Sequence, residues 1–277
     1  MTPTANTEPA MNEQFPPPLI DDGISRRSLL RAGLTATALA ALSSCDSALS
    51  PVSAPESSSV GANVRVSHDT YAVHVGPSVA NNPRYPRQFL AACGVSPTPN
   101  PEFVATYLSF DGGASWQNGG LPPRPAVGPA GDDVTVAFDA RGRGYICATR
   151  AGHTSNLNPA SPDADRAVYV WRTDDGGRTF STPVTLLQGQ YCDHPYLATG
   201  HGQTMDENDV YVAWGAGVSH TALDFTHSND GGESFEPPRR ILAEASVSSL
   251  VSAGPALATG PHGLVCACWP RHACRHA

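Results

Sequence analysis

The sequence predicts an all-β protein in which one four-stranded antiparallel unit is repeated along the chain. An eight-residue pattern, Ser/Thr-x-Asp-Gly-Gly-x-Ser/Thr-aromatic, occurs at residues 109–116, 173–180 and 228–235. A second pattern, four residues that end in alanine, recurs at spacings of 57, 61 and 60 residues. Short apolar runs of strand type separate the two patterns, and no helical periodicity is found after residue 45.

The elements of one unit follow each other in a fixed order. A first strand carries the alanine pattern, at residues 77–80, 134–137, 195–198 and 255–258. A second strand follows at residues 88–93, 144–148, 209–214 and 263–269. A third leads into the eight-residue pattern, as at residues 103–108 and 167–171, and a fourth leaves it, as at residues 180–186. Four short strands per period of ~40–60 residues are typical of a propeller blade.

The eight-residue pattern is expected to form the hairpin between the third and fourth strands. Its glycines can adopt positive φ, and its aspartate can accept hydrogen bonds from the N–H groups of its own turn. We therefore expect Asp111, Asp175 and Asp230 to fix turns rather than to catalyse a reaction. The positions of this structural motif are Ser109, Asp111, Gly113, Ser115, Trp116, Thr173, Asp175, Gly177, Thr179, Phe180, Ser228, Asp230, Gly232, Ser234 and Phe235.

This pattern resembles the Asp-box, or BNR repeat, of the sialidase-like β-propellers. The resemblance covers residues 65–269 and implies four-stranded blades, of which about three and a half are present where the family has six. It is specific for the fold and weak for activity, because Asp-boxes also occur in non-catalytic propellers and in other glycosidases. The Arg-Ile-Pro motif that carries the first sialic-acid-binding arginine of the family is absent, so a complete sialidase site cannot be assembled from this chain.

Residues 270–277 form an atypical tail. Their Arg, His, Cys and Pro content departs from blade sequence, and the chain has arginine but no lysine, which suggests a GC-rich genome. We expect a truncation or a frameshift there; a short natural tail is the alternative. An open array of blades exposes the edges of its first and last members, so we also expect the chain to self-associate.

Residues 1–45 are expected to direct export rather than to fold. Residues 25–30, Ser-Arg-Arg-Ser-Leu-Leu, resemble a twin-arginine motif, and a stretch too short to span a membrane follows. Residues 42–45 resemble a lipobox with Cys45 as the lipidated residue. Residues 46–64, rich in Ser, Pro and Ala, are expected to be a flexible linker. We expect an extracytoplasmic protein anchored to the membrane only through Cys45, or a secreted one if no lipid is added.

Charge and cysteine content restrict the partners. A formal net charge of −8 without a basic stripe argues against nucleic acid. Cys93, Cys147 and Cys268 fall in second strands, where they either pair after export or serve as small buried apolar residues. The cysteines and histidines of the tail match no zinc spacing, so we expect no metal and no cofactor.

A ligand site is expected on the face opposite the hairpins, near the axis. Residues entering the first strands include Asp132, Asp133, Asp193 and His194. Arg150, His153 and His220 lie in or beside the loops between second and third strands. Asp133, Asp193, Arg150 and His194 are the catalytic candidates, although a solvated loop-edge side chain is the simpler interpretation of each.

Three functions are compatible with these observations. The first is an exported, surface-tethered propeller that binds a glycan or an extracytoplasmic protein without catalysis. The second is an exo-α-sialidase or related glycoside hydrolase, active in a longer parent protein. The third is an extracytoplasmic assembly or scaffold factor. The absent Arg-Ile-Pro motif favours the first and third.

Overall fold

The computed structural model describes residues 61–97, 103–126, 130–150, 166–200, 209–217, 222–242, 249–250, 254–260, 264–269 and 272–273. Within these ranges every regular element is a β-strand, which confirms the all-β class. None of them holds a helix long and apolar enough to cross a membrane. The export segment, Cys45 and nearly all of the 46–64 linker lie outside the described residues, as do His153 and His220.

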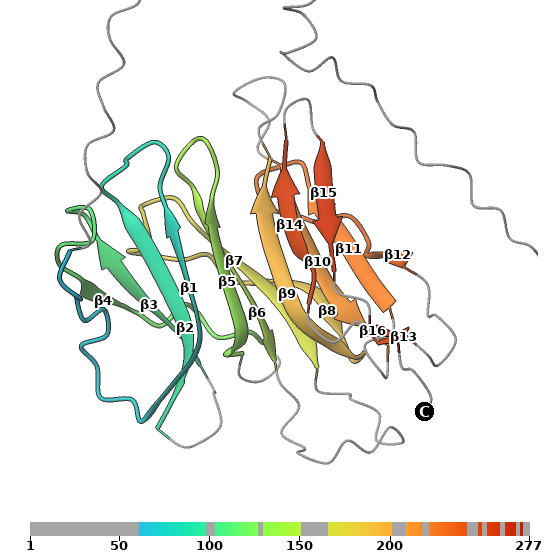
Figure 1. Ribbon diagram of the computed structural model, residues 1–277, viewed down its shortest axis with the longest axis horizontal. Helices are drawn as coiled ribbons and strands as arrows, with labels where there is room; N and C mark the ends of the chain where they lie inside the picture. Colours follow the sequence, from blue (N-terminus) through green and yellow to red (C-terminus); the bar gives the residue numbers. More distant parts are fainter. Residues whose placement is uncertain are drawn as a thin grey trace, which may run out of the picture. The chain divides into compact units, whose positions relative to one another are not determined.

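Three complete blades follow one another along the chain (Figure 1). Each is a four-stranded antiparallel sheet whose strands are adjacent in sequence order. Blade 1 contains β1 (Val73–Asn81), β2 (Phe89–Ser96), β3 (Phe103–Ser109) and β4 (Gln117–Gly120). Blade 2 contains β5 (Asp132–Phe138), β6 (Gly144–Arg150), β7 (Ala167–Thr173) and β8 (Val184–Gln188). Blade 3 contains β9 (Cys192–Thr199), β10 (Val210–Ala216), β11 (Ala222–Ser228) and β12 (Arg239–Leu242).

The fourth repeat forms a two-stranded sheet from β14 (Ala256–Thr259) and β15 (Val265–Cys268). Separately, β13 (Ser249–Leu250) pairs with β16 (His272–Ala273). The described part of the tail is therefore a short strand. β8 begins at Val184, later than the expected residue 180, because the backbone N–H of Ser181 still donates to the carbonyl of Arg172 at the base of the hairpin.

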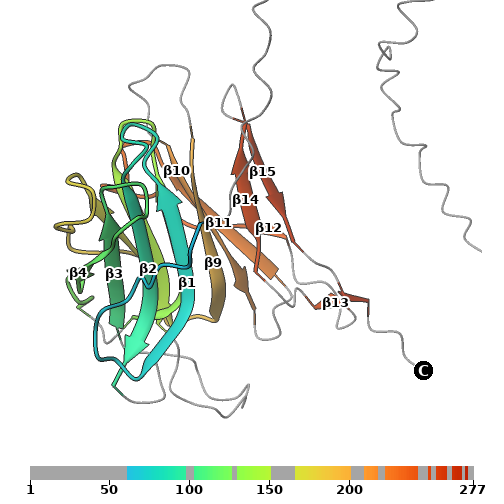
Figure 2. The same cartoon turned by 60° about the vertical axis from the view of Figure 1, so that its left-hand side comes forward.

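The first strands of the sheets lie beside one another. β1 packs beside β5, β5 beside β9, and β9 beside β14 (Figures 1 and 2). This arrangement places the first strand of each sheet nearest the common axis and the fourth at the rim, as in a propeller.

The core lies between blades rather than within them. Side chains alternate along each second strand, so Ile146 packs toward blade 1 while Tyr145 and Cys147 pack toward blade 3. The corresponding residues of blade 3, Tyr211 and Ala213, pack against the β14–β15 sheet. Burial of each large aliphatic side chain contributes about 1.5–3 kcal/mol, so the blades are held together chiefly by these interfaces.

Each of the three Asp-Gly-Gly hairpins has its own hydrogen-bond network, and the three networks follow the same pattern. In the second, the Asp175 carboxylate accepts from the Thr173 hydroxyl and from the N–H groups of Arg178 and Thr179, each at 2.9 Å. The first carboxylate accepts mainly from the hydroxyl and N–H of Ser115, and these bonds lower the pKa of Asp111 to about 2. In the third hairpin, desolvation raises the pKa of Asp230, but hydrogen bonds from the hydroxyl and N–H of Ser234 outweigh it and lower the pKa to about 2.

Each later hairpin also contacts the blade that precedes it. The Gln88 amide of blade 1 donates to the carbonyl of Gly176 at 3.4 Å. One blade further on, the Tyr145 hydroxyl and the Arg143 guanidinium both lie within hydrogen-bonding distance of the Gly231 carbonyl, at 3.1 and 3.2 Å. The glycines adopt positive φ at these turns, and a Cβ on Gly176 or Gly231 would collide with the side chain from the preceding blade.

Two of the three cysteines in second strands are buried as the simpler expectation had it, and for Cys268 that expectation was wrong. Cys93 and Cys147 are buried thiols, whereas Cys266 and Cys268 are exposed on β15. No disulfide occurs among the cysteines that the structure describes.

Candidate functional site

Residues at one equivalent position of the four repeats lie close together near the axis. Four residues before each repeated alanine stand Gly76, Asp133, His194 and Gly254. The first three adopt positive φ, at 55°, 49° and 46°, and the strand register shifts around each of them. A left-handed conformation is unusual for residues other than glycine and often marks functional sites. The bulges turn the side chains of Asp133 and His194 toward each other across the boundary between blades 2 and 3.

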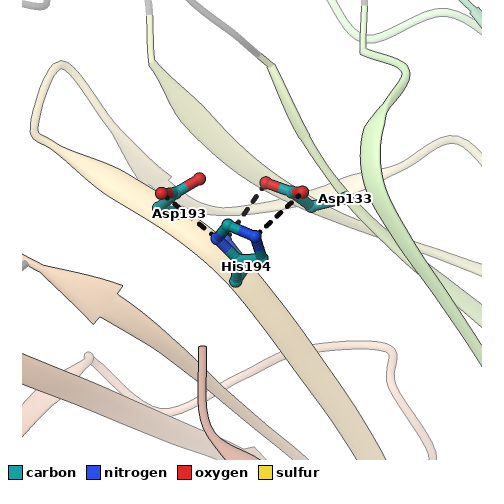
Figure 3. Close-up of side chains that lie close together, drawn as sticks. All are labelled: Asp133, Asp193 and His194. Atoms are coloured by element: carbon teal, nitrogen blue, oxygen red, sulfur yellow. Dashed lines mark hydrogen bonds and ion pairs between the residues drawn. The ribbon is translucent and has the colours of Figure 1, made fainter. Parts of the chain in front are cut away.

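Asp133, Asp193 and His194 form the axial trio. The backbone N–H of His194 donates to Asp133 Oδ2 at 3.1 Å. The imidazole lies between the two carboxylates, with Nδ1 3.2 Å from Asp193 Oδ2 and Nε2 3.8 Å from Asp133 Oδ1 (Figure 3). The carboxylates are largely buried, but the His194 side chain is 52% exposed. The trio therefore has a solvent-facing imidazole supported by two less accessible acids.

Burial and neighbouring charge shift the pKa values of the trio. Desolvation, followed by the negative charge of Asp132, raises the pKa of Asp133 to about 6, and the His194 imidazole only partly opposes the rise. Desolvation lowers the pKa of His194, but the charges of Asp133 and Asp193 outweigh it, and the pKa is raised above its ordinary value of 6.5. Near neutral pH the site therefore contains a carboxyl group that can gain or lose a proton and an imidazole that favours the charged form.

A cavity of about 400 Å³ opens beside the trio. Residues at the start of the first strands of all four repeats line it, with Asp133, Thr135 and His194 among prolines and the exposed ring of Tyr196. Its volume lies within the ~300–1,000 Å³ of small-ligand sites. Apolar walls, one aromatic ring and a few convergent polar groups suit a ligand that presents both hydroxyls and C–H faces.

Asp133, Asp193 and His194 are three of the four catalytic candidates, and the structure places the fourth, Arg150, on the neighbouring strand. Arg150 ends β6, opposite Ala167 of β7, so it stands one strand farther from the axis than Asp133. Its positive charge acts on Tyr169, where it opposes the rise in the pKa of that phenol caused by burial. Thr149, next to Arg150, does reach the trio, with its hydroxyl 3.4 Å from Asp133 Oδ2.

Sequence reasoning missed Tyr196 and the two glycines of the axial row. A Cβ on Gly254 would collide with the Cβ and carbonyl oxygen of His194, so glycine is needed there for close approach. The signal was available: the four positions share the same distance from the repeated alanine. It was missed because the residues themselves differ, Gly, Asp, His and Gly.

The trio is also a possible cation site by spacing. One ligand atom from each of Asp133, Asp193 and His194 lies within 4.8 Å of the others. In the structure the imidazole lies between the two carboxylates.

Comparison with known proteins shows the fold. No family model matches the sequence, and no curated protein sequence is similar enough to match. Among solved structures, an α-L-arabinanase of Penicillium chrysogenum complexed with arabinobiose aligns with a TM-score of 0.53 and 13% identity, covering 73% of this chain and 59% of that one. A GH93 α-L-arabinofuranosidase of Fusarium graminearum gives a TM-score of 0.49 and 12% identity, with 66% and 52% covered. A Trypanosoma rangeli sialidase in complex with sialic acid gives 0.42 and 16%, with 68% and 32% covered.

The chain spans about three fifths of the arabinanase and about half of the arabinofuranosidase. Identities this low concern architecture alone. Together with the sheet topology, the similarity to the arabinanase shows that this chain has the fold of a β-propeller of four-stranded blades.

Proposed function

We propose that this chain is an exported propeller of the Asp-box type that binds a glycan in the axial cavity. The observation that carries the proposal is that Asp133 and His194 line a cavity of suitable volume, with Asp193 beside the His194 imidazole. Carboxylates and an imidazole pair well with sugar hydroxyls, and the Tyr196 ring offers an apolar face for a sugar ring to stack on. The three Asp-Gly-Gly hairpins and the glycan-binding neighbours of this fold support the same proposal.

Calorimetric titration with neutral and acidic oligosaccharides tests it. Asp193→Asn and Tyr196→Ala should each weaken binding at least tenfold, because one removes the carboxylate that holds the His194 imidazole beside the cavity and the other removes the stacking surface. Tyr85→Ala is the matched control, since Tyr85 is an exposed tyrosine that lines the polar cavity beside the Gly176 hairpin. Equal binding by all three variants and the unaltered chain would remove the axial cavity from consideration.

Glycoside hydrolysis is the second candidate, favoured by the raised pKa of Asp133. A carboxyl group with a pKa of about 6 is suited to donate a proton to a departing sugar oxygen near neutral pH. Oxygens of Asp133 and Asp193 lie within 4.8 Å of each other, so the two carboxylates are close enough to act as a pair. Here Asp133 is the acid and Asp193 the second carboxylate.

A panel of aryl glycosides tests the hydrolase. Release of the aryl group that Asp133→Asn abolishes, while glycan binding persists, supports catalysis. Binding without turnover of any substrate supports the non-catalytic function.

We also propose that the twin-arginine segment exports the chain and that Cys45 anchors it. The order of the two motifs, followed by a Ser/Pro/Ala-rich segment, supports this. Labelling of expressing cells with a radioactive fatty acid should mark the unaltered chain but not Cys45→Ala. Replacing both Arg26 and Arg27 with lysine should retain the precursor in the cytoplasm; processing that continues unchanged would argue against this export route.

A further inference from the structure

The interfaces between blades repeat one register. The repeated alanine of one blade packs in the same apolar cluster as the aliphatic residue that precedes the alanine of the next blade. The pairs are Ala80 with Val136, Ala137 with Leu197, and Ala198 with Leu257. Each blade thus has a trailing face, which carries the alanine, and a leading face, which carries the aliphatic residue.

The leading face of blade 1 is open. Val79 is equivalent to Val136, Leu197 and Leu257, which are 8%, 3% and 7% exposed, yet Val79 is 60% exposed. It borders a mostly apolar cavity of about 440 Å³ that also contains Cys93. Among the described residues outside the blade, Val66 and Tyr71 pack against this side, and Val79 stays uncovered (Figure 2 brings blade 1 forward).

Among the residues that the structure describes, the trailing face of the β14–β15 sheet is also uncovered. Strand register makes Ala258, Cys266 and Cys268 equivalent to Ala137, Tyr145 and Cys147 of blade 2. The Tyr145 and Cys147 side chains are buried against blade 3, whereas Ala258, Cys266 and Cys268 are all exposed. Within the described residues, both halves of one more blade interface are therefore present on a single chain. The trailing face is apolar, and the leading face is mostly apolar with the Asp69–His74 ion pair beside it.

We propose that the β14–β15 face of one copy packs against the leading face of blade 1 of a second copy, with Ala258 beside the partner's Val79. The occupant is a second copy because the contact continues the register of the three interfaces inside the chain. Such a head-to-tail contact joins two different surfaces. Made reciprocally by two copies, it closes a ring of eight blade positions, within the ~4–8 blades of known propellers. The contact differs from edge-to-edge strand pairing, because it uses side-chain faces.

Sedimentation velocity on the full chain tests the proposal. A dimer is expected, and both Val79→Asp and Ala258→Asp should weaken its association at least tenfold by burying an unpaired carboxylate. Ile241→Asp is the matched control, since Ile241 is an exposed aliphatic residue on the rim strand β12. Circular dichroism would establish that each variant keeps its strand content.

Mixing the two variants gives a sharper test. Val79→Asp retains an intact trailing face and Ala258→Asp an intact leading face, so neither associates alone but the mixture should form a dimer through one interface. A monomeric unaltered chain would overturn the proposal, whether this face is then bare or covered by other residues of the same chain. A dimer that Val79→Asp leaves intact, or a mixture that stays monomeric, would overturn it too.

Discussion

Replacing Tyr145 with phenylalanine should destabilise the protein out of proportion to the single atom removed. The Tyr145 side chain is fully buried, and its hydroxyl lies 3.0 Å from Asp139 Oδ2 and 3.1 Å from the Gly231 carbonyl oxygen of the next blade. Asp139 is itself fully buried. Its other carboxylate oxygen accepts from the N–H groups of Arg141 and Arg143, each at 2.9 Å. Among the described residues, Oδ2 has only the Tyr145 hydroxyl as a hydrogen-bond donor.

The magnitude follows from that geometry. A hydrogen bond to a charged group contributes about 1.5–3 kcal/mol, and a buried acceptor left without a donor costs a similar amount. The free energy of unfolding should therefore fall by about 2 kcal/mol. Tyr211 occupies the equivalent position of blade 3, but its hydroxyl bonds to the half-buried Asp209 at 3.0 Å. Tyr211→Phe should cost about 0.5–1 kcal/mol, because water can replace the lost donor.

Urea unfolding followed by tryptophan fluorescence measures both effects, since Trp171 and Trp214 are buried in the inter-blade core. Tyr85→Phe, at an exposed tyrosine, controls for the substitution itself. A loss below about 0.5 kcal/mol for Tyr145→Phe, or one no larger than for Tyr211→Phe, would refute the reasoning from buried hydrogen bonds.

Three further outcomes are expected. Gly254→Ala should displace His194 and weaken glycan binding at least tenfold, whereas Gly61→Ala, where an added Cβ meets nothing within 4 Å, should leave calorimetric titrations unchanged. The pKa of Asp230 in the folded protein is lowered to about 2 from an ordinary 3.8, so the stability it contributes is complete above pH 3.8 and is lost as the pH falls toward 2. Asp230→Asn should therefore flatten the pH dependence of the free energy of unfolding in urea between these values. An unchanged pH dependence would contradict the hydrogen-bond network. The raised pKa of His194 contributes stability that is complete below pH 6.5 and is lost as the pH rises through the folded value. Histidine NMR titration should show that Asp193→Asn lowers this pKa, and a His194 that titrates identically in both proteins would exclude the ion pair.

The fold could be predicted because its signals are local and repeated. The glycines at 112–113, 176–177 and 231–232 fix hairpins through their own φ angles. Successive side chains of β2, β6 and β10 point to opposite faces of the sheet, and both faces are buried. Several strand boundaries shifted by a few residues, and the later start of β8 at Val184 comes where the hairpin extends into the following residues.

The site was predictable only in part, because it depends on contacts between blades. Asp133, Asp193 and His194 could be placed on the correct face from strand direction alone. Their contact depends on the bulges in β5 and β9. Neither Asp133 nor His194 is a glycine that would indicate a bulge in the sequence. Arg150 was expected in the loop after the second strand, but it is the last residue of β6, and its distance from the axis follows from that strand.

The hydrogen bonds between the two later hairpins and their preceding blades bear on how the protein folds during synthesis. Gln88 and Tyr145 offer hydrogen-bond partners to hairpins that are translated 88 and 86 residues later. A newly synthesised hairpin therefore finds its docking partner on a blade that has already left the ribosome. Assembly can proceed from the N-terminus with nearest-neighbour contacts only, as in linear repeat proteins. The side chains that dock a hairpin, Gln88 and Tyr145, belong to the preceding blade, so the loss of that blade in evolution would also remove the hairpin's hydrogen-bond partners.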